Sequence, residues 1–260
     1  MLLLKECDNN TKYFHCQANQ RNQRNHILGL EDEDGVWIED EATMGKVTKR
    51  YFEVMFTSSN PSGFDEILDG VHHTVIVDGD VGVDGDFQAK ELYQALKQVA
   101  TLTTLGPNGM SPIFYKSFWH IVGEDVTVVV LNALNSHIIL ESINTTFISL
   151  IPKIKNPKKV ADFRPISLCN VIYKLNAKVV ANHLKMFLVQ TMPDSQSVFL
   201  SGRLISDNIL IAFATLHYLK RKTTGKLGYM ALKLDISKAY DQVEWEFLEK
   251  IMHHLGLDEK

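Results

Sequence analysis

Two aspartates and a tyrosine that could act on a metal ion or a phosphate stand close together in ALKLDISKAYDQVEWEFL, residues 231–248. Apolar and polar side chains alternate over residues 231–236, which predicts a strand with Asp235 near its end, on the face opposite the leucines. Ser237 can cap a following helix, because apolar residues recur at helical spacing from Tyr240 onward. Asp235 is therefore expected at a strand-to-helix corner, an exposed and rigid place that suits a metal ligand.

The chemistry that such carboxylates serve is magnesium binding. Mg²⁺ prefers one or two carboxylates together with the phosphate oxygens of a substrate. A two-metal site needs several carboxylates around ions about 3.5–4 Å apart, and Asp241 could join Asp235 only from the helix. Structural alternatives stay open: Asp235 as a turn former, Asp241 as an acid that favours a helix N-terminus, and Tyr240 as a core aromatic.

A cluster of cations lies in KIKNPKKVADFRP, residues 153–165, between the apolar segments FISLIP and ISLCNVIY. This order of segments predicts a two-stranded hairpin with a basic tip. Only Asp162 opposes the cations there, which are Lys153, Lys155, Lys158, Lys159 and Arg164. Such a cluster suits phosphate through its charge and through the two-pronged geometry of arginine. A solvated hairpin tip is the alternative.

Composition indicates a globular, soluble, intracellular protein of 260 residues, with 45% hydrophobic and 22% charged residues. The formal charge is −4, so a nucleic-acid partner can be argued only from local patches such as the 153–165 segment. No apolar run approaches the ~18 residues that a membrane span needs. The sequence also contains no P-loop, no Rossmann glycine pattern and no GxSxG motif.

The remaining segments predict mostly helices. Residues 57–86, rich in Ser, Asn, Gly and Asp, are expected to be a loop or linker. Asp86 is the expected N-cap of the helix after it. A short hairpin is expected around Asp34-Gly35, and helices are expected at 42–56, 87–102, 113–134 (one or two), 173–188 and 207–219.

Taken together, several blocks resemble the reverse transcriptases of LINE-type, non-LTR retrotransposons, particularly the plant type. LKLDISKAYDQVEWEFL resembles the family's first catalytic-aspartate motif, and LIPKIKNPKKVADFRPISLCNVIYKLNAKVVANHLK resembles its fingers motif. Further similar blocks are QSVFLSGRLISDNILIA, LGPNGMSPIFYKSFWHIVGEDV and NTKYFHCQANQRNQRNHI, the last resembling the connector between endonuclease and polymerase. The resemblance covers nearly the whole chain, in order.

The resemblance implies an α+β fold, a partial right-hand polymerase with fingers, the start of the palm and a mostly helical N-terminal connector. It divides the chain into the connector (residues 1–60), a linker with a helical extension (61–145) and a partial reverse transcriptase domain (146–260). The family's roles fall on these positions: Asp235 as catalytic metal ligand, with Asp241 weaker; Lys153, Arg164, Ile236 and Tyr240 at the nucleotide; Gln196 and Arg203 at template and primer.

The family's reaction is Mg²⁺-dependent, RNA-directed DNA synthesis, with an RNA template, a DNA primer and deoxynucleoside triphosphates as partners. The sequence ends before a tandem Asp-Asp motif, so a truncated fragment that is inactive by itself is expected. A non-enzymatic nucleic-acid-binding remnant that uses the 153–164 hairpin is the alternative. The chain departs from the family pattern at Asn108, at His183 and at Ser201, where the family generally has an aspartate, a basic residue and a proline.

Overall fold

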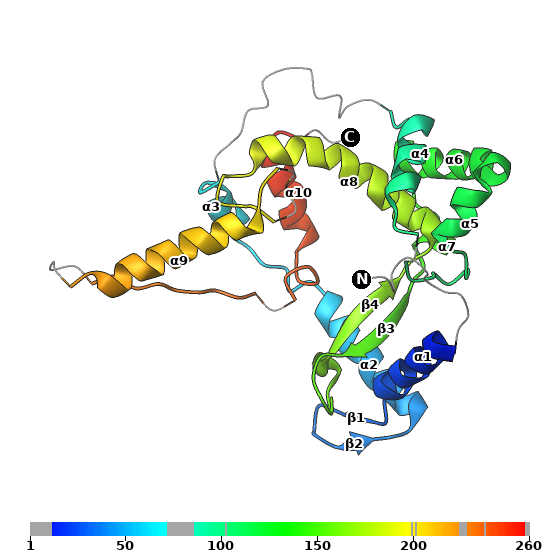
Figure 1. The fold of residues 1–260 in the computed structure, drawn as a ribbon, viewed down its shortest axis with the longest axis horizontal. Coiled ribbons are helices and arrows are strands. Elements are labelled where there is room, and N and C mark those ends of the chain that lie inside the picture. The colour runs from blue at the N-terminus through cyan, green and yellow to red at the C-terminus, as the bar shows by residue number, and fades with distance from the viewer. Residues whose placement is uncertain are drawn as a thin grey trace. The chain divides into compact units, whose positions relative to one another are not determined.

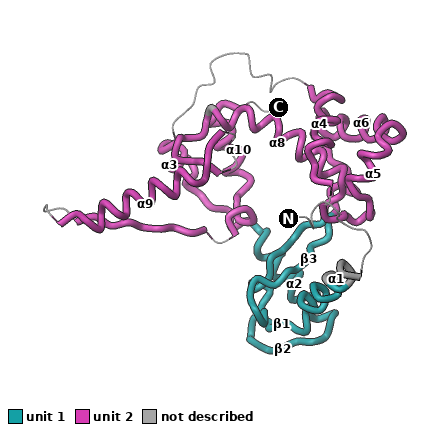
Figure 2. Tube along the Cα trace, in the orientation of Figure 1, with its two compact units in different colours: residues 1–57, 146–168 teal, residues 58–145, 169–260 magenta. Residues whose placement is uncertain are grey.

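The computed structural model describes residues 12–71, 86–101, 103–198, 200, 202–223, 228–236 and 238–257. The chain divides into two compact units, residues 1–57 with 146–168 and residues 58–145 with 169–260 (Figure 2). Each unit is described by itself. Ser201 and Ser237 lie outside the described residues.

Helices dominate both units, and the strands form two separate antiparallel pairs, β1 with β2 and β3 with β4 (Figure 1). This mixture agrees with the predicted α+β class. In chain order the elements are α1 (Lys12–Asn25), β1 (Leu30–Glu31), β2 (Trp37–Ile38), α2 (Glu41–Phe56), α3 (Phe64–Leu68), α4 (Ala89–Gln98), α5 (Pro112–Ser117), α6 (Trp119–Asn135), α7 (Glu141–Asn144), β3 (Phe147–Pro152), the 3₁₀ turn η2 (Val160–Asp162), β4 (Phe163–Leu168), α8 (Val171–Thr191), α9 (Ile205–Arg221) and α10 (Trp245–His254).

The first unit combines the N-terminal segment with the β3–β4 hairpin. The predicted hairpin at Asp34-Gly35 is confirmed: Asp32 accepts hydrogen bonds from the amides of Asp34 (3.0 Å) and Val36 (2.8 Å), and Gly35 has a φ of 80°. The helix predicted at 42–56 is also confirmed as α2. The core of this unit is apolar and consists of Leu30, Phe52, Val160 and Phe163.

The β3–β4 hairpin confirms the two-stranded hairpin predicted from FISLIP and ISLCNVIY, but β4 spans Phe163–Leu168, and residues 171–173 of the second apolar segment belong to α8. Its register runs from Phe147 opposite Leu168 to Pro152 opposite Phe163. Neighbours along a strand point to opposite faces. The buried Phe163 therefore faces the core of the unit, whereas the exposed Arg164, opposite Ile151, lies on the other face of the hairpin.

The core of the second unit lies among α4, α5, α6 and α8. Leu92 and Leu96 of α4 pack with Val130 of α6 and with Leu175 of α8, and all four are almost completely buried. The helices predicted at 113–134, 173–188 and 207–219 are confirmed as α5 with α6, α8 and α9. Helix α9, like α10, has no buried residue.

Two boundary predictions between residues 57 and 98 are wrong. The stretch expected to be entirely loop contains α3, because Phe64 and Leu68 are buried on one side of a single helical turn. Helix α4 is capped by Gln88 and not by Asp86: the carboxylate of Glu91 accepts the Gln88 amide at 2.8 Å, and the Phe87 amide bonds to Asn135 at 2.9 Å. With Gln88 as the N-cap, the helix begins at Ala89.

The prediction of a strand at residues 231–236 is also wrong. These residues form no ladder, and all six are exposed; Leu232 and Leu234 expose 72% and 78% of their surface. A strand requires a neighbour to accept and donate its backbone hydrogen bonds, and no described segment pairs with this one. The helix expected from Ser237 onward begins only at Trp245, after a turn over residues 238–242.

Within the described residues, no helix is long and apolar enough to cross a membrane.

Candidate functional site

The tip of the β3–β4 hairpin is organised by the one acid of its basic segment. Asp162 Oδ2 accepts hydrogen bonds from the backbone amides of Lys158 and Lys159, both at 3.0 Å. Its carbonyl accepts the Lys153 amide at 2.8 Å. The bonds from the amides of Lys159 and Lys158, in that order, lower the pKa of the Asp162 carboxyl, and the charges of Lys159 and Lys153 lower it further. Asp162 therefore holds the loop that carries the lysines.

The cations of the hairpin differ in what they contact. The Lys153 ammonium donates a hydrogen bond to the Ala161 carbonyl at 3.1 Å. Lys158 pairs with Glu31 of β1 at 3.1 Å, beside a 2.8 Å backbone bond from the Glu31 amide to the Lys158 carbonyl. These contacts attach the tip to the N-terminal segment.

Among the described residues, no carboxylate forms a salt bridge with Lys155 or Arg164. Both side chains are exposed. Of the two residues predicted at the nucleotide from this hairpin, Arg164 is thus open to a phosphate, whereas Lys153 is already engaged by the hairpin itself.

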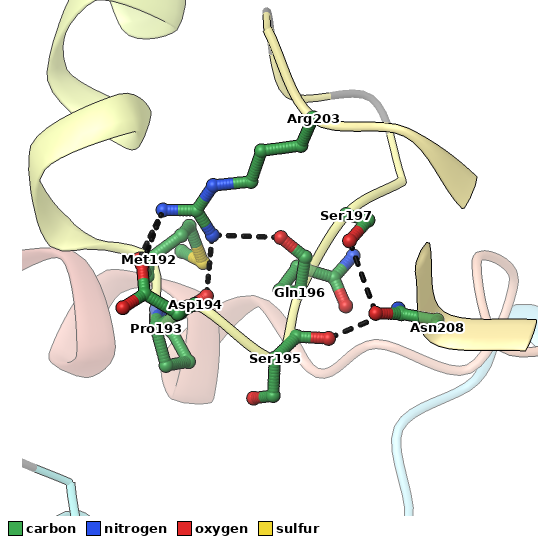
Figure 3. A network of polar contacts seen from close by, with 8 residues as sticks. All are labelled: Met192, Pro193, Asp194, Ser195, Gln196, Ser197, Arg203 and Asn208. Atoms are coloured by element: carbon green, nitrogen blue, oxygen red, sulfur yellow. Dashed lines mark hydrogen bonds and ion pairs between the residues drawn. The ribbon is translucent and has the colours of Figure 1, made fainter. Parts of the chain in front are cut away.

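Arg203, predicted at template and primer, is turned toward its own chain in the second unit (Figure 3). Its guanidinium donates to the carbonyls of Gln196 (2.7 Å) and Met192 (3.0 Å) and also to that of Pro193. Asp194 lies 3.5 Å from Nη2, and its side chain is fully exposed. Arg203 itself exposes only 21% of its side chain.

The same loop is tied to the first turns of α9. Asn208 donates to the Ser195 carbonyl at 3.0 Å and accepts from the Ser197 hydroxyl at 3.1 Å (Figure 3). Ser197 is buried, whereas Gln196 is exposed. The side-chain amide of Gln196 donates one long hydrogen bond, of 3.4 Å, to the Val198 carbonyl. The predicted template residues Gln196 and Arg203 are therefore neighbours, one exposed and one folded inward.

Asp235 lies in the extended and exposed segment 228–236 of the second unit. Ile236 and Tyr240 beside it expose 73% and 83% of their surface, so Tyr240 is not a core aromatic here. Asp241 is half-buried, and its amide bonds to the Lys238 carbonyl at 2.9 Å in the turn that follows.

The segment continues into α10, which is held by α3. Phe64 and Phe247 pack with ring centroids 5.5 Å apart, and Lys250 lies over the Phe64 ring at 5.3 Å. Ser58 also donates to Glu244, the residue before α10, at 2.7 Å. These contacts fix the end of the segment that carries Asp235.

The described residues contain no cluster of several metal-ligating side chains. No group of three or more His, Cys, Asp or Glu side chains that could hold a metal ion is present among them. Asp235 and Asp241 therefore lack, within the described part of the chain, the additional carboxylates that a two-metal centre requires.

One polar pair in the second unit had no signal in the sequence. His183, noted only as a departure from a family pattern, is buried in α8 with its Nε2 2.6 Å from Glu91 Oε1 of α4. Phe87 packs on the imidazole with centroids 4.7 Å apart. Burial raises the pKa of Glu91, but bonds from the Gln88 amide and His183, with the charge of His183, outweigh it and lower the pKa.

Two comparisons with known proteins bear on this chain. Residues 154–260 match the family described as "Reverse transcriptase (RNA-dependent DNA polymerase)". The chain is also 28% identical over 250 residues to "Transposon TX1 uncharacterized 149 kDa protein" of Xenopus laevis, an alignment that covers 95% of this chain and 19% of the relative. The chain thus spans about a fifth of that relative's length. Residues 154–260 are therefore similar to reverse transcriptases, and nearly the whole chain is similar to a part of a transposon protein.

Proposed function

We propose that this chain supplies the triphosphate-binding hairpin and the first metal-binding carboxylate of an RNA-directed DNA polymerase that uses two Mg²⁺ ions. The observation that carries the proposal is the basic hairpin: Arg164 is exposed and has no carboxylate partner among the described residues, and it lies in β4, next to the loop that Asp162 holds in shape. A guanidinium on a preorganised backbone suits a phosphate.

In this proposal Arg164 binds the phosphates of the incoming deoxynucleoside triphosphate. The backbone of Ile236 lies near the same triphosphate, and Tyr240 lies beside the sugar. Gln196 contacts the RNA template or the DNA primer. Lys153 supports the loop through its bond to Ala161 and adds charge near the phosphates. Asp235, assisted by Asp241, takes part in metal binding only when further carboxylates join them.

We further propose that the fold is a partial right hand, in which the hairpin belongs to the fingers and the Asp235 segment to the start of the palm. The divisions at residues 60 and 145 remain part of this proposal. The exposed segment 228–236, which pairs with no other described segment, supports it, since alternating leucines favour a sheet when neighbouring strands are present.

Phosphate contact by the hairpin is tested by filter binding of single-stranded RNA to the full chain over a range of salt concentrations. Each lost phosphate contact reduces the slope of log K against log[salt] by about 0.7 for single strands. Arg164→Ala is expected to reduce the slope by about that amount. Arg50→Ala is the matched control, because Arg50 lies in the same unit and already pairs with Glu33 at 3.1 Å. Equal slopes for both variants would refute the contact.

Polymerase activity of the chain by itself is a separate question, and we propose that it is absent. Among the described residues, Asp235 and Asp241 lack the further carboxylates that two Mg²⁺ ions need, and two-metal catalysis depends on both ions. Primer extension on an RNA template with the purified chain and Mg²⁺ tests this proposal. Template-dependent extension that Asp235→Ala abolishes, and that Asp125→Ala on the exposed side of α6 does not, would overturn it.

The second candidate function is nucleic-acid binding without catalysis, and the same basic hairpin favours it. The two candidates differ in one outcome: binding with an Arg164-dependent salt slope but no extension supports this second function for the isolated chain.

A further inference from the structure

Helix α8 ends without a cation of its own. The last four carbonyls of a helix have no intrahelical donor, and they lie at the negative end of the helix dipole. Cations in the last turn commonly satisfy both needs, but the last turn of α8 contains no basic residue. The backbone amide of Met192, the C-cap residue, donates to the Leu188 carbonyl at 3.0 Å. The Met192 carbonyl is one of the last carbonyls at this end of the helix.

Arg203 supplies that missing cation from beyond the loop. Its guanidinium reaches the Met192 carbonyl at 3.0 Å, the Gln196 carbonyl at 2.7 Å and the Pro193 carbonyl (Figure 3). Gly202 just before it has a φ of 81°, a left-handed conformation that glycine adopts without strain. Three converging carbonyls match the planar, multi-donor guanidinium and not the point charge of a lysine.

We propose that Arg203 is a positioning residue that acts through Gln196, and that it is not itself a contact to nucleic acid. The inference rests on the proposed function only for the role of Gln196 at the template or primer. Arg203 holds the backbone of the junction, defined as residues 192–198 and 202–208, so that the exposed Gln196 side chain leaves it in one direction. Asn208 holds the same backbone from α9 through Ser195 and Ser197.

The first test measures the junction without any ligand, by hydrogen–deuterium exchange of the full chain. The Gln196 amide bonds to the Pro193 carbonyl at 3.0 Å, so its exchange reports on the loop. Arg203→Gln and Arg203→Lys are both expected to speed exchange of peptides over residues 188–198 about tenfold, since bonds from a charged donor are lost. The β3–β4 hairpin serves as the unchanged internal reference.

Two further variants separate the carbonyl contacts from simple charge pairing. Asp194→Asn is expected to leave exchange within about twofold, because that exposed carboxylate contributes little. Asn208→Ala is expected to speed exchange of the same peptides, since it releases the junction from the α9 side. It also keeps the inference testable if an Arg203 variant does not fold.

The second test distinguishes a positioning residue from a phosphate contact by RNA binding. Arg203→Gln is expected to weaken binding without changing the salt slope, and Arg203→Lys is expected to weaken it equally despite its retained charge. The double variant of Arg203→Gln with Gln196→Ala is expected to bind no more weakly than Gln196→Ala alone.

The inference is overturned if Arg203→Gln lowers the slope of log K against log[salt] by about 0.7 while Arg203→Lys keeps the slope of the unmodified chain. It is also overturned if hydrogen–deuterium exchange at residues 188–198 is unchanged in both variants. If the unmodified chain binds no RNA, the proposed function fails, and the exchange measurement still decides the role of Arg203.

Discussion

Glu91 on α4 and His183 on α8 form a contact of 2.6 Å across the core of the second unit, although 92 positions separate them in the sequence. The lowered pKa of Glu91 means that the folded state favours its carboxylate. A group with a lowered pKa in the folded state stabilises the protein above its unfolded pKa, and this contribution is lost as the pH falls through the folded value.

Glu91→Gln is therefore expected to lower the free energy of unfolding by about 1 kcal/mol at neutral pH. Because the usual pKa of a glutamate is near 4.5, the two proteins should converge as the pH falls below that value. Urea unfolding at several pH values measures both effects. Glu124→Gln, on the exposed side of α6, is the control and should change little. A difference that persists below the pKa of Glu91 would contradict the assignment.

Asp162→Ala is expected to loosen the tip of the β3–β4 hairpin. The variant removes the acceptor for the amides of Lys158 and Lys159. Solvent screens this exposed carboxylate, so the loss of stability should be only about 1 kcal/mol. Proteolysis within residues 153–162 should accelerate more than unfolding does. Lys155→Gln removes one charge from the same tip without removing a backbone bond, and it should leave cleavage unchanged.

Gly106→Ala is expected to destabilise the second unit by about 1–3 kcal/mol, through overpacking. A Cβ at this position would lie 2.6 Å from the backbone nitrogen and Cα of Asn170, just before α8, and 2.6 Å from the Cys169 carbonyl. Neither backbone can move without displacing the helix.

The control for Gly106 is Gly45→Ala within α2, where a Cβ would meet nothing within 4 Å. That substitution should stabilise the protein by about 0.5–1 kcal/mol, because alanine loses less backbone entropy in a helix. Thermal unfolding of both variants measures the contrast. Equal changes would refute the close-approach argument.

Helix α9 should tolerate polar substitution on its apolar stripe. Ile209 and Phe213 expose 64% and 67% of their surface, and no residue of the helix is buried. Ile209→Lys combined with Phe213→Lys is expected to leave the free energy of unfolding within about 0.5 kcal/mol and to reduce self-association in sedimentation experiments. Leu96→Lys, in the core, should instead unfold the second unit.

Local patterns predicted most helices of this chain. The spacing of Leu175, Val179 and Leu184 was sufficient for α8, and the apolar segment around Ile166 after a basic turn was sufficient to predict the strand β4. The alternation of apolar and polar residues at Leu232 and Leu234 predicted a strand that is not formed. The difference is the partner: β4 pairs with β3 a few residues away, whereas residues 231–236 have no neighbour among the described segments.

By itself, the amino-acid sequence predicted the resemblance to reverse transcriptases, most of the helices, the basic hairpin and the candidate residues for phosphate binding. Only the tertiary structure decided which of these residues are open to a ligand: Arg164 is exposed, whereas Arg203 is occupied by the carbonyls of Met192, at the end of α8, and of Gln196, in the loop that follows. The reason is that residue type and spacing report the burial periodicity of a segment, whereas the partner of a long polar side chain depends on which carbonyls the folded chain brings to it.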